Sequence, residues 1–307
     1  MNLEIADIER RLAERFLELT VAPLRHLETG FGSIVVETND GVIFRIARHG
    51  RAAHGHAREA KLLPALQGRL PVAVPDPRWR VEPGSSGFPH GAIGHPRLAG
   101  TPLSPVLLAR LGPESIARQL AAFLLALHRF PAGEAEALGL PHADRDVEAL
   151  RAFRDEVLPP LANALAPDEY RIVRAWWDGL VADPQIRRFT PTLRHGDLWY
   201  DHLLVDEPSG RLVAVIDWEA AALGDLARDF AVQFHLGGEF AEVTLAAYAA
   251  QGGRVDESLQ HRIRKQWELR EFGGIRTAVE LKDEEEFGDA VRKLKAGPLL
   301  AGPHTRD

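Results

Sequence analysis

One stretch of sequence decides the fold: TLRHGDLWYDHLLVD at residues 192–206, followed after a turn by RLVAVID at residues 211–217. The apolar parts of both segments favour strands, and the Glu-Pro-Ser-Gly sequence between them, residues 207–210, is typical of a turn. We therefore predict a β-hairpin. In an antiparallel pair, the start of the first strand lies beside the end of the second.

This hairpin is expected to gather three polar side chains. Asp197 and His202 precede its first strand and Asp217 follows its second, so all three should converge on one small volume. Two carboxylates and an imidazole suit a divalent cation together with a residue for acid–base chemistry or substrate positioning. The alternative is a polar loop whose aspartates only cap turns, and the convergence of all three residues makes that alternative the weaker one.

The composition excludes several classes of protein. The chain has 307 residues, of which 45% are apolar and 26% charged, as expected for a globular chain of two lobes or one large domain. It has no apolar run of membrane-spanning length, and its charged N-terminus does not resemble a secretory signal. The absence of cysteine excludes disulfides and thiolate chemistry, and the formal net charge of −7 argues against a general nucleic-acid binder. We expect a cytoplasmic protein with neither a membrane nor a nucleic-acid partner; the sequence does not indicate its oligomeric state.

Hydrophobic periodicity divides the chain into two parts. Residues 1–94 predict a β-rich lobe, residues 95–103 a connector rich in Gly and Pro, and residues 104–307 a larger lobe dominated by helical periods. The expected elements of the first lobe are a helix over 3–19, strands over 34–38 and 42–47 joined by Asn-Asp-Gly, and a helix over 57–66. In the second lobe we expect helices over 115–129, 146–165, 168–182 and within 225–296. The fold class is therefore α+β.

The order His195-Gly-Asp197-x-x-x-x-His202, then a hairpin that ends in Ile216-Asp217-Trp-Glu, resembles the catalytic and metal-binding motifs of the aminoglycoside phosphotransferase-like kinases. The resemblance implies a bilobal protein-kinase-like fold and a phosphotransferase in which Asp197 receives the proton of an acceptor hydroxyl. It implies His202 and Asp217 as ligands of Mg²⁺. His202 stands where the family usually has Asn, as in the 2″-type aminoglycoside and the macrolide phosphotransferases. Because imidazole is a soft ligand for Mg²⁺, Mn²⁺ is expected to substitute well.

The resemblance extends to a nucleotide site in the first lobe. Arg45 stands where the family carries the lysine that binds the α- and β-phosphates of ATP or GTP, and Glu59 matches the helix glutamate that pairs with it. Ser33, in the segment Thr29-Gly-Phe-Gly-Ser, is expected at the phosphates, and Leu98 of the connector completes the nucleotide-binding set. The alternatives are an arginine that extends from an edge strand to solvent and glycines that only form a tight turn.

The acceptor is the part that the sequence determines least. Resemblance to the 2″-type enzymes implies that acidic and aromatic residues of the last helices face a cationic amino sugar. The candidates are Glu239, Trp267, Glu268 and Glu271. However, residues 234–239 carry one carboxylate where those enzymes are more acidic, so a macrolide or another metabolite alcohol stays open as the acceptor.

Two other functions, and a structural role for several residues, stay open. The chain is either a kinase or, as less favoured alternatives, a nucleotide-binding pseudokinase or a metallohydrolase that uses His195, Asp197, His202 and Asp217 as one metal cluster. We expect His195 to brace the catalytic loop rather than to transfer protons. Asp225 and Asp229, in the segment after Asp217, are expected to brace it through hydrogen bonds to the backbone.

Overall fold

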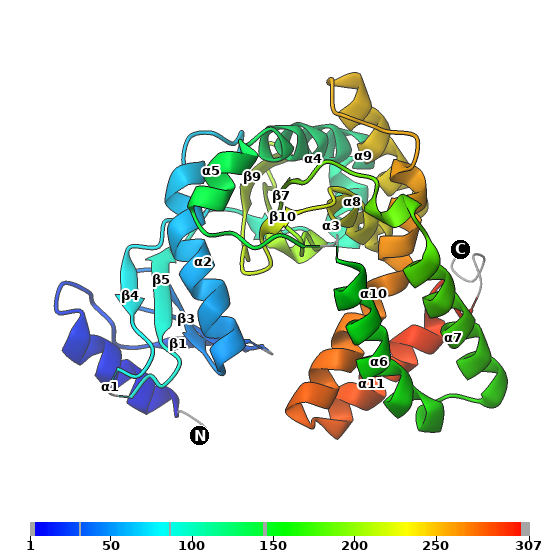
Figure 1. Ribbon diagram of the computed structural model, residues 1–307. Helices are drawn as coiled ribbons and strands as arrows, with labels where there is room; N and C mark the ends of the chain where they lie inside the picture. The colour runs from blue at the N-terminus through cyan, green and yellow to red at the C-terminus, as the bar shows by residue number, and fades with distance from the viewer. Residues whose placement is uncertain (1–3, 31, 86, 144–145, 302–307) are drawn as a thin grey trace.

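The computed structural model describes residues 4–30, 32–85, 87–143 and 146–301, so Phe31 of the glycine-rich segment lies outside the described residues. Two lobes are visible in Figure 1, with the elements of the N-terminal lobe in blue and cyan. That lobe is an antiparallel sheet of order β1-β2-β3-β5-β4 with two helices. Its elements are α1 (Ile5–Arg15), β1 (Arg25–Thr29), β2 (Ser33–Glu37), β3 (Val42–Ala47), α2 (Gly50–Leu66), β4 (Trp79–Val81) and β5 (Ala92–Pro96).

The alternation of side chains along β3 assembles the N-terminal lobe. Val42, Phe44 and Ile46 are buried in a cluster with Ile8 and Leu12 of α1. Successive side chains of a strand point to opposite faces, so Arg45 lies on the face of β3 away from this core. The predicted hairpin of β2 and β3 is confirmed.

Three details differ from the expected elements of this lobe. The first helix ends at Arg15 rather than at residue 19. The second helix begins at Gly50, seven residues earlier than predicted, because His49 caps it by accepting a hydrogen bond from the Ala52 N–H. Strand β1 was not predicted, because its side chains are exposed and, apart from Leu27, polar, so that they lack an apolar alternation.

The C-terminal lobe is mainly helical, as predicted, and its short strands lie between the N-terminal lobe and the most distant helices (Figure 1). The predicted helix over 115–129 is α4, whose apolar stripe is fully buried in the largest core cluster. The elements are β6 (Thr101–Pro102), α3 (Pro105–Leu111), α4 (Pro113–His128), α5 (Ala132–Ala137), α6 (Val147–Ala164), α7 (Pro167–Ala182), η1 (Gln185–Arg187), β7 (Thr192–Arg194), η2 (Tyr200–His202), β8 (Leu203–Asp206), β9 (Arg211–Val215), β10 (Ala222–Gly224), α8 (Ala227–Ala231), η3 (Val232–Leu236), α9 (Gly238–Ala250), α10 (Leu259–Leu281) and α11 (Glu284–Ala296).

The hairpin that was predicted from residues 192–217 is present as β8 and β9. Leu203 pairs with Val215, and Asp206 with Arg211. Strand β6, just after β5, adds to the same sheet through β8, so the chain enters the second lobe directly beside the hairpin. Among the described residues, no helix is long and apolar enough to cross a membrane.

Candidate active site

The hairpin brings its two polar ends together, as the sequence predicts. The Ile216 N–H donates a hydrogen bond to the His202 carbonyl at 3.0 Å, which fixes the residues before β8 against those after β9. The Nε2 atom of His202 lies 3.6 Å from Oδ2 of Asp217. Asp217 itself has a φ of +64°, in the left-handed region that non-glycine residues seldom adopt. Such a backbone conformation is often found at functional sites.

The loop that carries Asp197 is held by a buried carboxylate. Asp229 accepts hydrogen bonds from the backbone N–H groups of His195 and Gly196, at 3.0 and 2.8 Å, and binds the ring of His128 at 3.2 Å. Gly196 has a φ of +85°, and a Cβ there would lie 2.5 Å from the Ala220 carbonyl oxygen, so only glycine fits. The bracing role predicted for Asp229 is thus what its contacts provide. Asp225 instead binds the Ala227 N–H and the guanidinium of Arg262.

The carboxylate of Asp197 is available to a substrate. Its backbone is engaged with His195 and His202, but within the described part of the chain its side-chain oxygens make no hydrogen bond. Burial raises the pKa of Asp197 above its usual value, and the positive neighbourhood of His202 opposes that rise. A carboxylate whose pKa is raised is a stronger proton acceptor than an ordinary surface aspartate.

His202 is oriented as a metal-binding histidine is. Its Nδ1 lies 2.8 Å from the Asp197 carbonyl oxygen, which can only accept, so Nδ1 carries a proton, and Nε2, which faces Asp217, is the ring nitrogen that can bind a cation. Histidines that ligate metals usually donate their other ring N–H to a carbonyl or carboxylate. The donor set of one imidazole nitrogen and one carboxylate oxygen therefore fits a divalent cation.

His195 has a different environment. Its Nε2 donates to the Ile216 carbonyl at 3.0 Å, its Nδ1 accepts from the Asp197 N–H at 3.3 Å, and burial lowers its pKa to about 4. Both ring nitrogens are therefore occupied within the loop. The metallohydrolase alternative needs His195 as a fourth metal ligand, and these contacts argue against it.

Arg45 lies at the centre of a buried ion cluster. Its Nη1 binds Oε1 of Glu59 at 2.7 Å, as the resemblance implies, and its Nη2 binds Asp217 at 2.9 Å and Glu219 at 2.8 Å. Strand β3 is in the middle of its sheet and the Arg45 side chain is 13% exposed, so the alternative of an arginine on an edge strand is wrong.

Three carboxylates thus face one guanidinium. The pKa of Glu59 is raised to about 7, mainly by burial; Arg45 opposes this rise, and the charges of Asp217 and Glu219 add to it. Burying charges is costly unless they are paired. The excess of negative charge makes this cluster a favourable place for an added cation.

Two predicted nucleotide-binding residues are less engaged with this cluster. Ser33 is buried, and its hydroxyl lies 3.1 Å from Nε2 of His56 on α2. Leu98 is half-buried in the connector between β5 and β6. Ser33 thus faces α2, and Leu98 lies in the segment that joins the two lobes.

The four predicted acceptor residues do not form one group. Glu239 is exposed on the first turn of α9 and has no polar partner among the described residues. Glu268 binds Nζ of Lys265 at 2.8 Å and Nε1 of Trp176 at 2.6 Å, while Glu271 binds Nε of Arg270 at 2.8 Å. Two of the three carboxylates are therefore already neutralised by neighbours on α10.

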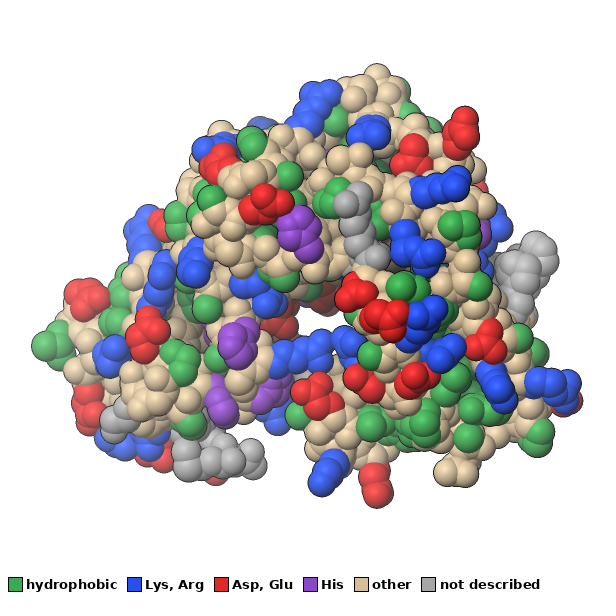
Figure 2. All heavy atoms as spheres, in the orientation of Figure 1, with side chains coloured by type: hydrophobic (Ala, Val, Ile, Leu, Met, Phe, Trp, Pro, Cys, Tyr) green, Lys and Arg blue, Asp and Glu red, His purple; other side chains and the backbone are tan. Residues whose placement is uncertain are grey.

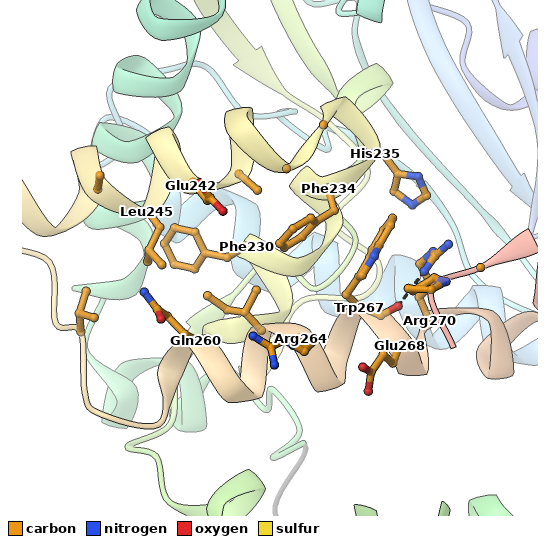
Figure 3. A pocket seen from close by; sticks show the side chains of 18 of the residues that line it. Phe230, Phe234, His235, Glu242, Leu245, Gln260, Arg264, Trp267, Glu268 and Arg270 are labelled. Atoms are coloured by element: carbon orange, nitrogen blue, oxygen red, sulfur yellow. Dashed lines mark hydrogen bonds between the residues drawn. The ribbon is translucent and has the colours of Figure 1, made fainter. Parts of the chain in front are cut away.

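Trp267 instead belongs to the wall of a cavity of about 1180 Å³ between α10 on one side and η3 and α9 on the other (Figure 3). Its ring stacks on Phe234 at 5.5 Å, and the guanidinium of Arg270 lies 3.5 Å from its centroid. Glu268 also borders the cavity, but its carboxylate points away from α9 (Figure 3). The lining is mostly apolar and includes Phe230, Leu245, Ile263 and the two exposed charged residues Glu242 and Arg264.

A chain of aromatic rings links this cavity to the catalytic loop. Trp199, two residues after Asp197, stacks on His235 with centroids 3.7 Å apart, and His235 contacts the edge of Trp267 at 4.7 Å. A molecule whose hydroxyl reaches Asp197 therefore has an aromatic surface beside it that leads into the cavity.

The two lobes also make contact between α2 and α10. Arg51 of α2 donates to the Thr277 hydroxyl at 3.3 Å and lies 3.5 Å from Glu280, both on α10. Figure 2 shows a hollow between the lobes with acidic and basic side chains around it. The side chains around this hollow are thus of mixed charge rather than uniformly acidic.

The roles of Glu219 and His128 were not predicted from the sequence. Glu219 was part of the recognised motif, but its contact with Arg45 spans 174 positions and leaves no local pattern. For His128 a signal existed, because a titratable residue on the buried stripe of α4 needs a partner, which is Asp229.

Comparisons with known proteins agree with this geometry. The family model described as "Phosphotransferase enzyme family" matches residues 25–264. The viomycin phosphotransferase of Streptomyces vinaceus is 28% identical over 94% of this chain and 99% of its own length. The macrolide 2′-phosphotransferase MphH of Brachybacterium faecium is 26% identical, with a TM-score of 0.71 over 97% of this chain and 99% of its own. The GDP and kanamycin complex of APH(2″)-IIIa has a TM-score of 0.84 at 21% identity, over 95% of this chain and 98% of its own.

These structural likenesses confirm the bilobal kinase-like fold, and the family match covers both lobes and every residue of the catalytic hairpin. The chain therefore belongs to the phosphotransferase enzyme family, and it is a phosphotransferase that acts on hydroxyl groups.

Proposed function

We propose that this phosphotransferase transfers the γ-phosphoryl group of ATP or GTP to a hydroxyl group of a small molecule, with Asp197 as the catalytic base. Residues 1–94 would bind the nucleotide, 95–103 serve as the hinge, and 104–307 carry the catalytic loop and the acceptor site. The observation that carries the proposal is the juxtaposition of a free carboxylate at Asp197 with the pair formed by His202 and Asp217.

The mechanism that this site supports is in-line transfer. Asp197 orients the acceptor hydroxyl and accepts its proton as the hydroxyl oxygen bonds to the γ-phosphorus and the bond from that phosphorus to the leaving nucleoside diphosphate breaks. Arg45, which Glu59 holds, neutralises charge on the α- and β-phosphates, and Ser33 and Leu98 complete the nucleotide contacts. A bound Mg²⁺, or Mn²⁺ in its place, would be held by His202 and Asp217 and would neutralise phosphate charge. Positioning and electrostatic stabilisation supply most of the acceleration in such reactions.

For the acceptor, an amino sugar is the first candidate. Glu239 and Glu242 are exposed carboxylates without a described partner, and the net charge of the chain is −7, so an amine would find favourable charges. Two structurally similar proteins are known in complexes with kanamycin and with gentamicin.

The cavity favours a second candidate, a larger acceptor with an apolar face, such as a macrolide. Its volume of about 1180 Å³ exceeds what a compact polar sugar needs, and its aromatic wall suits an apolar surface. Glu268 and Glu271, which we predicted to bind an amino sugar, are paired with basic neighbours and would bind a polycation only weakly.

A panel of acceptors tests the proposal. The chain would be incubated with ATP or GTP and Mg²⁺ together with kanamycin, viomycin or erythromycin, at low and at high salt, and each product examined by mass spectrometry. We expect one of them to gain a single phosphoryl group. Turnover of kanamycin that weakens steeply with salt would support the amino sugar, since exposed charge pairs are screened; turnover of erythromycin alone would support the apolar acceptor. Binding of nucleotide without transfer to any hydroxyl compound would contradict catalysis and favour a pseudokinase.

His202→Asn tests whether His202 is a metal ligand by a conservative substitution. We expect this variant to keep nucleotide binding with Mg²⁺ within a few-fold, because asparagine supplies the oxygen ligand that Mg²⁺ prefers. The advantage of Mn²⁺ over Mg²⁺ should shrink in the variant, as measured by titrating each metal against nucleotide affinity. If Mg²⁺-dependent binding were lost altogether, His202 would have a role other than that of a replaceable ligand.

A further inference from the structure

Glu219 lies two residues after Asp217 and has no role in the mechanism above. Its carboxylate nevertheless contacts Arg45, the cation at the centre of the ion cluster. Its Oε2 accepts a hydrogen bond from Nη2 of Arg45 at 2.8 Å, and its backbone carbonyl accepts one from Nη2 of Arg58 at 2.5 Å. Gly55 of α2 makes this approach possible, because a Cβ there would lie 2.8 Å from the Cβ of Glu219. A residue of the C-terminal lobe is thus packed into the N-terminal lobe, with its carboxylate on Arg45.

The two terminal nitrogens of Arg45 are divided between the lobes. Nη1 binds Glu59 of the same lobe, whereas Nη2 binds Asp217 and Glu219 of the other. A planar guanidinium can serve such a divided set, whereas a lysine ammonium is a single point charge. Asp217 contacts Arg45 through Oδ1 and faces His202 with Oδ2. Glu219 contacts Arg45 but, among the described residues, pairs with neither member of the predicted metal pair.

We propose that Glu219 is a positioning residue that holds the second terminal nitrogen of Arg45, so that the guanidinium stays directed at the nucleotide phosphates whether or not Asp217 binds a metal. The proposal rests on the proposed function, in which Arg45 contacts those phosphates. The arginine and this glutamate would then work as a matched pair in place of the usual lysine.

The direction in which nucleotide affinity changes when Glu219 is removed separates this role from simple charge repulsion. A carboxylate near bound phosphates repels them, so its removal alone should strengthen nucleotide binding. If Glu219 acts by orienting Arg45, its removal should weaken binding instead. The expected size is about tenfold, as for the loss of one hydrogen bond between charged groups.

The test measures the affinity of ADP and GDP by calorimetry, without any acceptor, for the full-length chain and for Glu219→Gln. We expect Glu219→Gln to weaken nucleotide binding about tenfold both with Mg²⁺ and with EDTA. In the Arg45→Lys background the same substitution should change the affinity less than about twofold, because the ammonium does not need the second partner.

Asp256→Asn is a matched control. The Asp256 side chain is 35% exposed and pairs with Arg262, just as that of Glu219 is 34% exposed and pairs with Arg45. It should leave nucleotide affinity unchanged. If Glu219→Gln does not fold, as judged by thermal melting, Glu219→Asp keeps the charge but shortens its reach, and should weaken binding in the same direction.

Each contrary result has a distinct meaning. Stronger binding after Glu219→Gln would make Glu219 only a repulsive charge. A loss seen with Mg²⁺ but not with EDTA would make it a metal ligand, and an equal loss in both Arg45 backgrounds would show that it does not act through Arg45. Each of these would overturn the proposal. Failure of the unmodified chain to bind either nucleotide would overturn the proposed function itself, and this role with it.

Discussion

Asp197→Asn is expected to lower the rate of phosphoryl transfer roughly 10²–10⁴-fold, the usual range for a positioned acid–base group. The Asp197 carboxylate makes no hydrogen bond within the described part of the chain, so asparagine breaks no internal contact that the structure shows. Its size is nearly that of aspartate, and the backbone contacts of residue 197 with His195 and His202 remain. What is lost is the proton acceptor.

Single-turnover kinetics with a saturating acceptor would measure this loss, and calorimetry with ADP or GDP would serve as its control. Nucleotide affinity should stay within a few-fold of that of the unmodified chain, because Asp197 acts on the acceptor hydroxyl. Transfer at nearly the original rate would remove Asp197 from the mechanism. Equal losses of nucleotide affinity and of rate would place it at the nucleotide instead.

The part of the site that the sequence predicts best is the part that a local hairpin determines. Asp197, His202 and Asp217 converge because strand pairing between residues 203–206 and 211–215 leaves no other arrangement of their ends. The pairing of Arg45 with Glu59 was available only through resemblance, because it joins a strand to a helix through tertiary packing.

The four residues predicted to bind the acceptor do not form one group, and part of the reason can be read from the sequence. Lys265 precedes Glu268 by three positions on one helix, and such spacing places opposite charges side by side. Arg270 is adjacent to Glu271. The cavity beside Trp267 was not predictable, because it depends on how α9 and α10 are spaced and on which side chains leave the space between them open.

Asp217→Ala is expected to weaken Mg²⁺-dependent nucleotide binding by about 100-fold or more, because loss of a metal ligand should exceed the roughly 10–100-fold that loss of an outer partner typically costs. Stability should respond differently. Arg45 retains Glu59 and Glu219, and the cluster loses one of three carboxylates that face one guanidinium. Removal of that excess negative charge offsets the lost ion pair, so charge alone gives little reason for the protein to unfold.

The backbone conformation of residue 217 determines which substitution isolates the role of the Asp217 carboxylate. Residue 217 has a φ of +64°, a conformation that costs an ordinary L-residue such as alanine roughly 1–2 kcal/mol but that asparagine tolerates. Asp217→Asn should therefore keep the melting temperature of the unmodified chain and still lose most of the Mg²⁺-dependent affinity, because a neutral amide replaces the charged ligand. Titrations of ADP with Mg²⁺ and with EDTA, together with thermal melting of both variants, separate the two effects. If Asp217→Asn bound Mg²⁺ and nucleotide as the original chain does, the loss in Asp217→Ala would come from backbone strain, and Asp217 would not be a charged ligand of the metal.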